Sequence, residues 1–137
     1  IVVAGVLAGL LVAFNAASAS AAPRPSNIEG GRISWDGALP CRDGASGTSV
    51  YTSPDYNAPG AGSYRTRIGL YRSNDSGRIA LSNLRDTRVF GSGWLPFAGW
   101  SYRSSYAGET YVVGYVYKLG SDNVYRLVAR EWIDCVR

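Results

Sequence analysis

Hydrophobic and polar residues alternate most regularly near the C-terminal end of the chain. Residues 110–133 read TYVVGYVYKL, GSDN and VYRLVAREWI, which are two runs rich in β-branched and aromatic residues around a polar turn. A period of two is typical of strands, because successive side chains point to opposite faces of a sheet. We therefore predict a β-hairpin with its turn at residues 120–123.

The two faces of this hairpin differ in chemistry. If Leu119 opposes Val124, one face is mostly aliphatic and the other is aromatic and cationic. An ordinary half-buried sheet surface explains the second face, with polar tips in water and arginine stems over apolar area. The alternative is a recognition surface, because the same residue types are enriched at binding hot spots. Its predicted partner-binding residues are Tyr111, Tyr115, Tyr117, Arg126, Arg130 and Trp132.

Shorter alternating runs predict further strands at 32–35, 50–52, 64–72, 78–81 and 87–90. In the run 64–72, Arg65, Arg67, Gly69 and Tyr71 share one face. Segments 42–48 and 53–63 read as turns, and 91–106 combines glycine with aromatic rings that either fill the core or bind a ligand. The pattern predicts an all-β fold, a small antiparallel β-sandwich or a partly open barrel.

The N-terminal residues have the composition of an export signal. Residues 1–14 are apolar and 15–22 are small, so we expect a secretory signal peptide at 1–21 with cleavage after Ala21. The basic segment that precedes such a core is missing, so we expect the sequence to begin inside the signal. A retained membrane anchor is the alternative, because residues 1–22 carry no charge.

Export bears on the two cysteines and on the segment that follows the signal. Cys41 and Cys135 are the only thiols, so we expect one disulfide between them in an extracellular setting. Residues 22–40 are rich in proline and glycine and predict an extended N-terminal arm, followed by a β-domain at 41–137. Part of this arm could add to a sheet edge of its own domain or of a partner. Its predicted partner-binding residues are Ile28, Arg32, Ile33 and Trp35.

Composition argues against several functions. The net charge of +4 comes from scattered basic residues, mostly arginine, so nucleic-acid binding is not expected. The chain has no histidine and no paired-cysteine motif, so we predict no metal site, no cofactor and no enzyme activity. Carboxylate pairs for glycoside cleavage are the remaining enzymatic alternative, drawn from Glu29, Asp36, Asp55, Glu109, Glu131 and Asp134.

Two resemblances to known families point to bacterial antagonism. The Ser92-Gly93-Trp94 and Trp100-Ser101-Tyr102 motifs resemble those of the secreted β-sandwich bacteriocins of the lactococcin type. The signal ending ASASAAP, the arm and the compact β-domain are together similar to the small adaptor subunit of the umbrella toxin particles of Streptomyces. That resemblance implies that the arm, at 28–35, threads into a protease-like lectin subunit while the domain engages the toxin-bearing subunit.

These observations together predict a secreted, non-enzymatic adaptor. We expect it to join other secreted proteins, without nucleic acid and without membrane contact after signal cleavage, through its arm and its aromatic and arginine-rich face. The alternatives are a free-standing bacteriocin-like effector and a secreted protease inhibitor that offers its arm or the segment 53–63 as a substrate mimic.

Overall fold

The computed structural model describes residues 25–35 and 40–137, and this part of the chain forms twelve strands and no helix. The strands are β1 (Ser26–Asn27), β2 (Arg32–Ser34), β3 (Cys41–Gly44), β4 (Gly47–Thr52), β5 (Asp55–Ala58), β6 (Gly62–Arg72), β7 (Arg78–Leu81), β8 (Arg85–Val89), β9 (Gly93–Pro96), β10 (Trp100–Ser104), β11 (Thr110–Leu119) and β12 (Tyr125–Asp134). Within the described residues, no helix is long and apolar enough to cross a membrane. The predicted signal peptide and residues 22–24 and 36–39 of the predicted arm lie outside the described residues.

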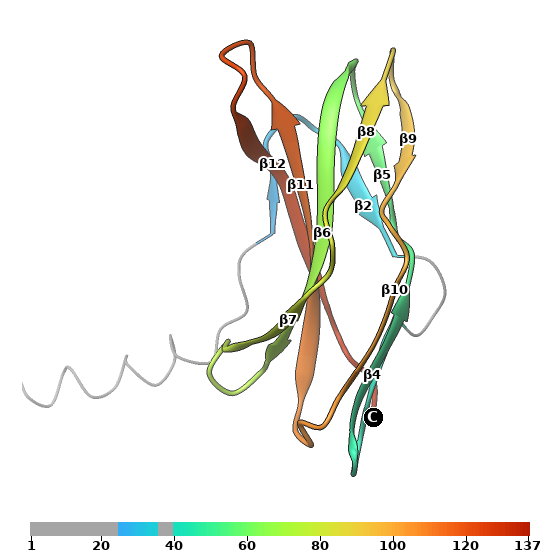
Figure 1. Cartoon of the computed structure of the whole chain (residues 1–137), viewed down its shortest axis with the longest axis vertical. Helices are drawn as coiled ribbons and strands as arrows, with labels where there is room; N and C mark the ends of the chain where they lie inside the picture. The colour runs from blue at the N-terminus through green and yellow to red at the C-terminus, as the bar shows by residue number, and fades with distance from the viewer. Residues whose placement is uncertain (1–24, 36–39) are drawn as a thin grey trace, which may run out of the picture.

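The strands form three antiparallel sheets (Figure 1). The large sheet has six strands in the order β1-β12-β11-β6-β7, with β8 also paired to β6. The upper sheet, β2-β5-β9, lies beside the upper part of the long strands in Figure 1, and the lower sheet, β10-β4-β3, lies beside their lower part. The sheets do not close into a barrel, so the predicted all-β, sandwich-like fold is confirmed.

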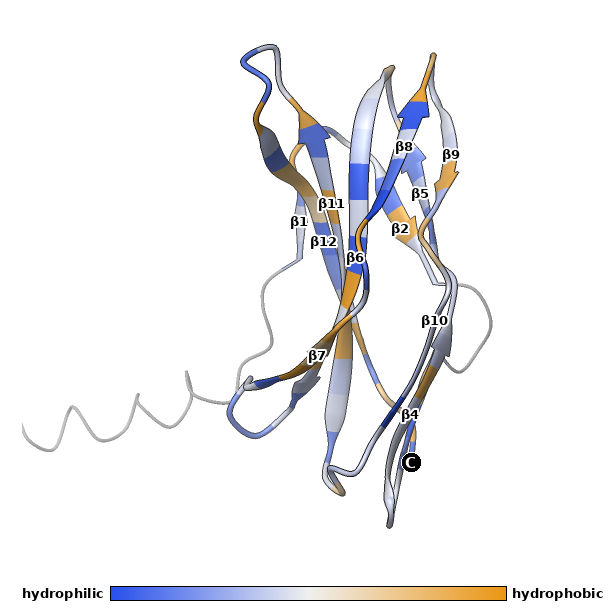
Figure 2. Cartoon of the chain, in the orientation of Figure 1, coloured by the Kyte–Doolittle hydropathy of each residue, from blue (hydrophilic) through white to orange (hydrophobic). Residues whose placement is uncertain are grey.

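The hydrophobic core lies between the large sheet and the two small ones. Hydrophobic residues are interrupted by hydrophilic ones along β6 and β12 (Figure 2), as expected for strands that bury one face. Because the core draws residues from all three sheets, burial of one apolar layer holds the sheets together. Its members are Ile33, Cys41, Val50, Tyr56, Ala58, Tyr64, Ile68, Leu70, Leu95, Phe97, Val112, Val116, Ala129 and Cys135.

The predicted C-terminal hairpin is present as β11 and β12, but its predicted register is wrong. Leu119 pairs with Tyr125, one residue further along than expected. A β-bulge next to Val116 adds one more residue to β12, so Tyr115 pairs with Arg130, two residues further along than expected. Between the turn and the bulge, the shift of one residue moves each β12 side chain to the face opposite the predicted one. Beyond the bulge, the shift of two residues returns the β12 side chains to their predicted faces.

The disulfide predicted between Cys41 and Cys135 is present, with an S–S distance of 2.02 Å. It connects β3 of the lower sheet to the residue that follows β12 of the large sheet. Backbone hydrogen bonds extend the connection, because Asp43 N–H donates to the Val136 carbonyl at 2.7 Å and Val136 N–H donates to the Cys41 carbonyl at 3.2 Å. The cross-link spans 94 residues of sequence, so it strongly restricts the unfolded chain.

The described part of the predicted arm belongs to the edges of this domain's own sheets. Its first strand, β1, pairs with β12 in the large sheet, and its second, β2, pairs with β5 in the upper sheet. Between them, Ile28 N–H donates to the Val128 carbonyl at 2.9 Å. The Glu131 carboxylate accepts a hydrogen bond from Ile33 N–H at 2.9 Å, which links the two sheets. The arm therefore crosses the open side of the sandwich and closes it.

Three segments that were predicted as turns or irregular structure contain strands. Residues 42–48 form most of a β3–β4 hairpin, residues 53–63 include β5, and residues 91–106 include β9 and β10. Glycine, serine and asparagine lowered the predicted strand propensity, but pairing and burial override it, since strand propensity depends strongly on context. Tyr56 and Ala58 of β5 are buried, so within this segment only residues 53–54 and 59–61 lie outside strands. The substrate-mimic alternative for 53–63 stays a prediction.

The aromatic residues of 91–106 divide between core and surface. Phe97 is buried in the core, whereas Trp94 is 60% exposed. Trp100 packs against the edge of the core and stacks on Tyr102, with ring centroids 5.3 Å apart. The expectation that the two tryptophans fill the core is therefore wrong for Trp94, because its position in β9 faces outward beside buried Leu95.

Candidate functional site

The outer face of the large sheet brings tyrosine and arginine residues together across three strands. Tyr115 of β11 pairs with Arg67 of β6 on one side and with Arg130 of β12 on the other. Tyr117, the next residue of β11 on this face, pairs with Arg65. On β12, Tyr117 is opposite Leu127. Residues directly opposite on adjacent strands have Cβ atoms about 5 Å apart, so Tyr115 has an arginine neighbour on both sides and Tyr117 has one on one side.

A glycine in β6 lets an aromatic layer form over the lower part of this face. The Tyr71 ring lies over Gly69, where a side chain of any size would collide with it. From there the Tyr71 hydroxyl hydrogen-bonds to the Tyr115 hydroxyl at 2.6 Å, and its ring stacks on Tyr111 with centroids 5.5 Å apart. Trp132 meets the Tyr111 ring edge-on at 5.9 Å. This layer buries Tyr111, which is only 1% exposed.

Burial sets the protonation of these phenols. It raises the pKa of Tyr115 above the ordinary value of 10.0, and the hydrogen bond with Tyr71 raises it further. Burial also raises the pKa of Tyr117, although Arg67 acts in the opposite direction. Both hydroxyls are therefore neutral at physiological pH. Neutral hydroxyls can donate or accept hydrogen bonds.

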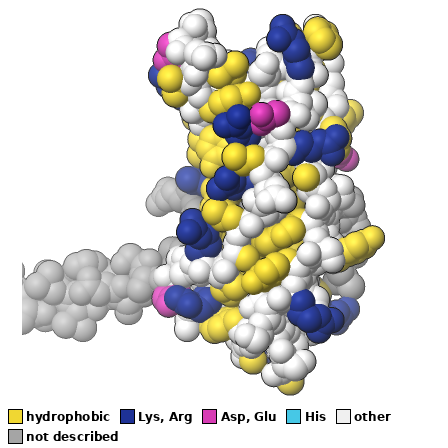
Figure 3. Space-filling view, viewed as in Figure 1, with side chains coloured by type: hydrophobic (Ala, Val, Ile, Leu, Met, Phe, Trp, Pro, Cys, Tyr) yellow, Lys and Arg dark blue, Asp and Glu magenta, His cyan; other side chains and the backbone are white. Residues whose placement is uncertain are grey.

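The upper part of the face combines paired and unpaired arginines. Arg65 forms a two-bond ion pair with Asp86, at 2.7 and 3.0 Å, and its guanidinium lies 4.1 Å from the centre of the Tyr125 ring. Arg67 has no carboxylate within ion-pairing distance among the residues that the structure describes. Figure 3 shows Lys and Arg side chains interspersed with hydrophobic ones over this side of the molecule. The face as a whole is apolar and cationic.

The structure brings most of the predicted hairpin residues together on this face. Tyr115, Tyr117, Arg130 and Trp132 are half-buried and keep part of their surface in solvent, while Tyr111 is fully covered. The placement of Arg126 on this face was wrong. It pairs with Lys118 above the bulge, on the opposite face, and binds the Asp122 carboxylate with its nearest contact at 2.5 Å.

The predicted binding residues of the arm divide between surface and interior. Ile28 is 71% exposed, and Arg32 lies 3.8 Å from Glu131 with most of its side chain in solvent. Ile33 is buried in the core. Trp35 packs against the core close to Gly114, where an added side chain would meet its ring. Ile33 is thus a packing residue of β2 rather than an accessible partner contact, whereas Trp35, which follows β2, is partly buried and its proposed partner contact stays a prediction.

The β6 residues of this face were not among the predicted partner-binding residues, although the sequence contained a signal for them. The alternation in 64–72 placed Arg65, Arg67 and Tyr71 on one face, but nothing in the sequence showed that β6 pairs with β11. Nonlocal pairing brings these arginines beside the hairpin tyrosines. The Tyr71 ring lies over Gly69 of its own strand, and pairing with β11 brings that ring beside Tyr111 and Tyr115.

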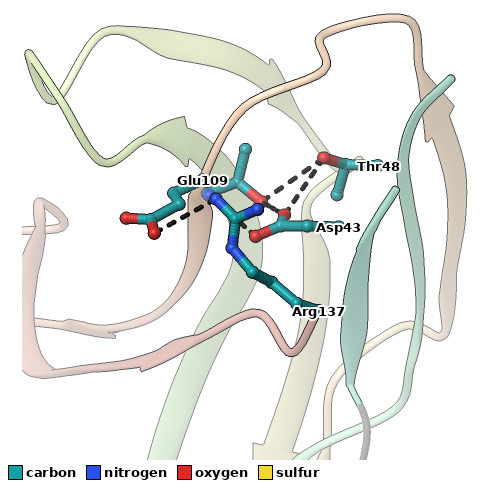
Figure 4. A network of polar contacts seen from close by, with 5 residues as sticks. Asp43, Thr48, Glu109 and Arg137 are labelled. Carbon is teal, nitrogen blue, oxygen red and sulfur yellow. Dashed lines mark hydrogen bonds and ion pairs between the residues drawn. The ribbon is translucent and has the colours of Figure 1, made fainter. Parts of the chain in front are cut away.

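A second polar cluster, with Asp43, Thr48, Glu109 and Arg137 (Figure 4), lies close to Cys135 of the disulfide. The buried Asp43 carboxylate accepts hydrogen bonds from the Thr110 hydroxyl at 2.5 Å, the Thr48 hydroxyl at 3.3 Å and the Thr110 backbone N–H at 3.4 Å. Nearby, Arg137 and Glu109 form an exposed ion pair at 3.1 Å. The hydrogen bonds of Asp43 satisfy its buried carboxylate and connect β3 to β4 and β11, so Asp43 has a structural role.

Two of the remaining carboxylates considered for catalysis, Glu29 and Glu131, have different partners within the domain. Glu29 accepts a hydrogen bond from the Tyr56 hydroxyl at 2.7 Å and contacts Lys118 at 3.4 Å. Glu131 binds the Ile33 backbone N–H, whereas Asp36 is not among the described residues. In residues 25–35 and 40–137, no group of three or more acidic or cysteine side chains is placed to hold a metal ion.

Comparison with known proteins adds no family. No protein-family model matches this chain, and no curated protein matches it significantly. Inferences about function therefore depend on the residues and geometry described above.

Proposed function

We propose that this chain is a secreted, non-enzymatic binding module, and that the outer face of its large sheet docks a protein with an acidic surface. The disulfide between Cys41 and Cys135 supports an oxidising, extracellular location, where such bonds persist. The predicted signal peptide is consistent with the same location.

One observation carries this proposal: the row Arg67, Tyr115 and Arg130 across three adjacent strands. Tyrosine, tryptophan and arginine dominate binding hot spots, because they combine large apolar area with directed hydrogen bonds. Here Tyr117 and Trp132 extend the row in both directions along the strands. Arginine on an apolar surface is suited to a carboxylate, which it can bind through two parallel hydrogen bonds. The partner is therefore expected to present acidic side chains around an apolar centre.

The adaptor role needs a second contact, and the arm contributes less to it than the sequence predicted. Ile28 and Arg32 are the predicted arm residues whose side chains are largely exposed, and they lie at the edge of the sandwich. We retain them as a secondary contact of the proposed docking face. The likeness to umbrella-particle adaptors and an antibacterial role of the complex are also proposals.

Site-specific cross-linking tests the docking face. A photo-reactive phenylalanine analogue replaces Tyr117 on the proposed face or, as a control, exposed Tyr51 on the opposite side of the core. Each protein is incubated with the other secreted proteins of its source. We expect the probe at Tyr117 to form a discrete adduct with an acidic protein, which mass spectrometry identifies, and the probe at Tyr51 to form none with that protein.

Paired charge variants complete the test. We expect R67Q together with R130Q to abolish the adduct, and R42Q together with R103Q, which remove the same charge from the other side, to preserve it. Adducts of equal yield from both probes, or an adduct that survives R67Q and R130Q, would contradict the proposal. Growth inhibition of sensitive bacteria by the purified chain alone would instead favour a free-standing effector.

A further inference from the structure

The lower sheet turns a second set of exposed side chains away from the core. In β4, Thr48, Val50 and Thr52 are buried, so the alternate residues Ser49 and Tyr51 point outward. Tyr51 is 82% exposed, which is unlike the covered tyrosines of the large sheet. The Tyr51 ring is therefore available to a ligand from solvent.

Cross-strand pairing arranges this face as two short rows. Ser49 pairs with Arg42 of β3 on one side and with Arg103 of β10 on the other. Adjacent strands are about 4.8 Å apart, so the two arginine Cα atoms lie about 10 Å apart with a hydroxyl between them. In the next row Tyr51 pairs with Ser101, which places a second hydroxyl beside the ring.

The charge on this face is positive and has no counterpart within the described chain. Neither Arg42 nor Arg103 forms an ion pair with a carboxylate of residues 25–35 or 40–137. The only acidic residue of β3, β4 and β10 is Asp43, which points inward and bonds to threonines. A shallow hollow of about 400 Å³ lies on this face, lined by Ser49, Val50, Tyr51, Ser101, Tyr102 and Arg103.

We propose that the outer face of the lower sheet binds an acidic polysaccharide whose sugars carry carboxylates. The C–H face of a sugar ring packs against the exposed Tyr51 ring, which offers an apolar surface with a polar tip. Arg42 and Arg103 bind carboxylates of the polymer through charge-assisted hydrogen bonds. Ser49 and Ser101 provide hydroxyls that donate to and accept from the sugar hydroxyls.

The composition of this face favours a polysaccharide over an acidic protein. Stable protein interfaces bury about 800 Å² on each partner around an apolar centre. This face instead offers one exposed ring surrounded by serine and arginine. A repeating polymer compensates for weak single contacts, because neighbouring units rebind before the chain dissociates. The site is independent of the proposed docking face, since the two outer faces point in opposite directions across the shared core.

Affinity electrophoresis and calorimetry with defined polymers test this proposal on the intact, oxidised chain. The probes are alginate and polygalacturonate, which carry a carboxylate on each sugar, dextran, which is neutral, and poly-glutamate, which has carboxylates without sugar rings. At an ionic strength of about 0.15 M, we expect binding to at least one polyuronate and no retardation by dextran. Poly-glutamate is expected to bind at least about tenfold more weakly, because it cannot stack on Tyr51.

Matched variants locate the site. We expect R42Q together with R103Q to weaken polyuronate binding by about tenfold or more, and Y51A to weaken it by a similar factor. R78Q together with R88Q removes the same charge from exposed positions of the large sheet and should leave binding unchanged. All these side chains are exposed, so circular dichroism should show an unaltered fold.

Three results would overturn the proposal. The first is no binding to either polyuronate. The second is equal binding of poly-glutamate combined with no effect of Y51A, which would mean general attraction of polyanions. The third is equal loss of binding in the control variant R78Q/R88Q. None of these outcomes bears on the cross-linking at Tyr117, so failure of this site and failure of the proposed docking face are distinguishable.

Discussion

The outer faces of the large sheet and the lower sheet both carry tyrosine and arginine, but the two faces bury their tyrosines to different extents. Tyr111 and Tyr51 both lie outward on strands beside arginine-bearing strands, yet Tyr111 is 1% exposed and Tyr51 is 82% exposed. The large sheet supplies Tyr111 with the rings of Tyr71 and Trp132 as neighbours. The lower sheet supplies Tyr51 with Ser101. The cross-strand neighbour therefore decides whether an outward tyrosine stabilises the fold or remains available for binding.

This difference also explains why the two faces suit different ligands. The large sheet has a layer of packed, mostly half-buried aromatic rings next to arginine side chains, which resembles the centre and rim of a protein interface. The lower sheet has isolated polar groups around one ring, which suits a hydroxylated, charged polymer. The following predictions test this contrast, from the largest expected effect to the smallest.

The substitution Y111A should cost about 3–5 kcal/mol in the free energy of unfolding, as expected for truncating a large buried ring. Its ring fills the space between Tyr71 and Trp132, and little can collapse into the cavity. Urea unfolding followed by fluorescence measures the loss. A cost below about 1 kcal/mol would show that the outer aromatic layer contributes little, and the contrast between the faces would fail.

Removing the disulfide with C41A and C135A should cost about 2–5 kcal/mol, chiefly by freeing the unfolded chain. The cross-link joins β3 to the end of β12, so its removal should lower the local stability of the lower sheet more than that of the centre of the large sheet. Amide hydrogen exchange should then accelerate first in β3 and β4. Uniform acceleration across β4, β6 and β11 would contradict a separate loosening of the lower sheet.

Stability should fall as the pH rises above 10, because burial raises the pKa of Tyr56, Tyr64 and Tyr111 in the folded chain. Their phenols ionise near pH 10 when the chain is unfolded, so the unfolded state releases protons first and is favoured. Each affected phenol contributes a slope of up to about 1.4 kcal/mol per pH unit until its folded pKa is reached. Urea unfolding at a series of alkaline pH values measures this, and a flat profile would contradict it.

The substitution Y71F should cost about 0.5–1.5 kcal/mol, the usual worth of one hydrogen bond. It removes only the hydroxyl that bonds to Tyr115 at 2.6 Å and keeps the ring over Gly69. A double-mutant cycle with Y115F isolates the pair, and the two effects should not be additive. Full additivity would mean that the hydroxyls act independently.

The smallest effect is expected for Y51A, whose cost in unfolding free energy should stay within about 0.5 kcal/mol. The ring is largely in solvent, so truncation leaves no cavity. The same variant should lose polyuronate binding by about tenfold. A large loss of stability would show that Tyr51 is a packing residue, and the proposed glycan site would lose its central contact.

The sequence predicted the class of fold and several of its parts because those depend on local patterns. Alternation over 110–133 located the hairpin, and the cysteine count predicted the bond between Cys41 and Cys135. It did not predict the β-bulge next to Val116, because a bulge is chosen by the packing of two strands together. It also did not predict that Leu119 pairs with Tyr125 rather than Val124, and this shift of one residue at the turn is why the placement of Arg126 failed.

Turn residues misled the prediction where burial overrode them. The segments 42–48 and 53–63 contain glycine, serine, asparagine and proline, yet they hold residues of four strands, β3, β4, β5 and the start of β6. The core needs inward residues from each of those strands, and Tyr56 supplies one of them. Local propensity is worth little against burial of a complete ring.

By itself, the sequence determined which residues alternate, where the strongest hairpin lies and which two cysteines can pair. Only the tertiary structure decided that Arg67 and Tyr71 of β6 lie beside Tyr115, and that β1 and β2 close the sandwich. The physical reason is that side-chain periodicity is a property of consecutive residues and can be read from the sequence. Strand pairing instead depends on which distant segments bury the most apolar surface together. Both proposed binding faces consist of residues that this pairing brings together.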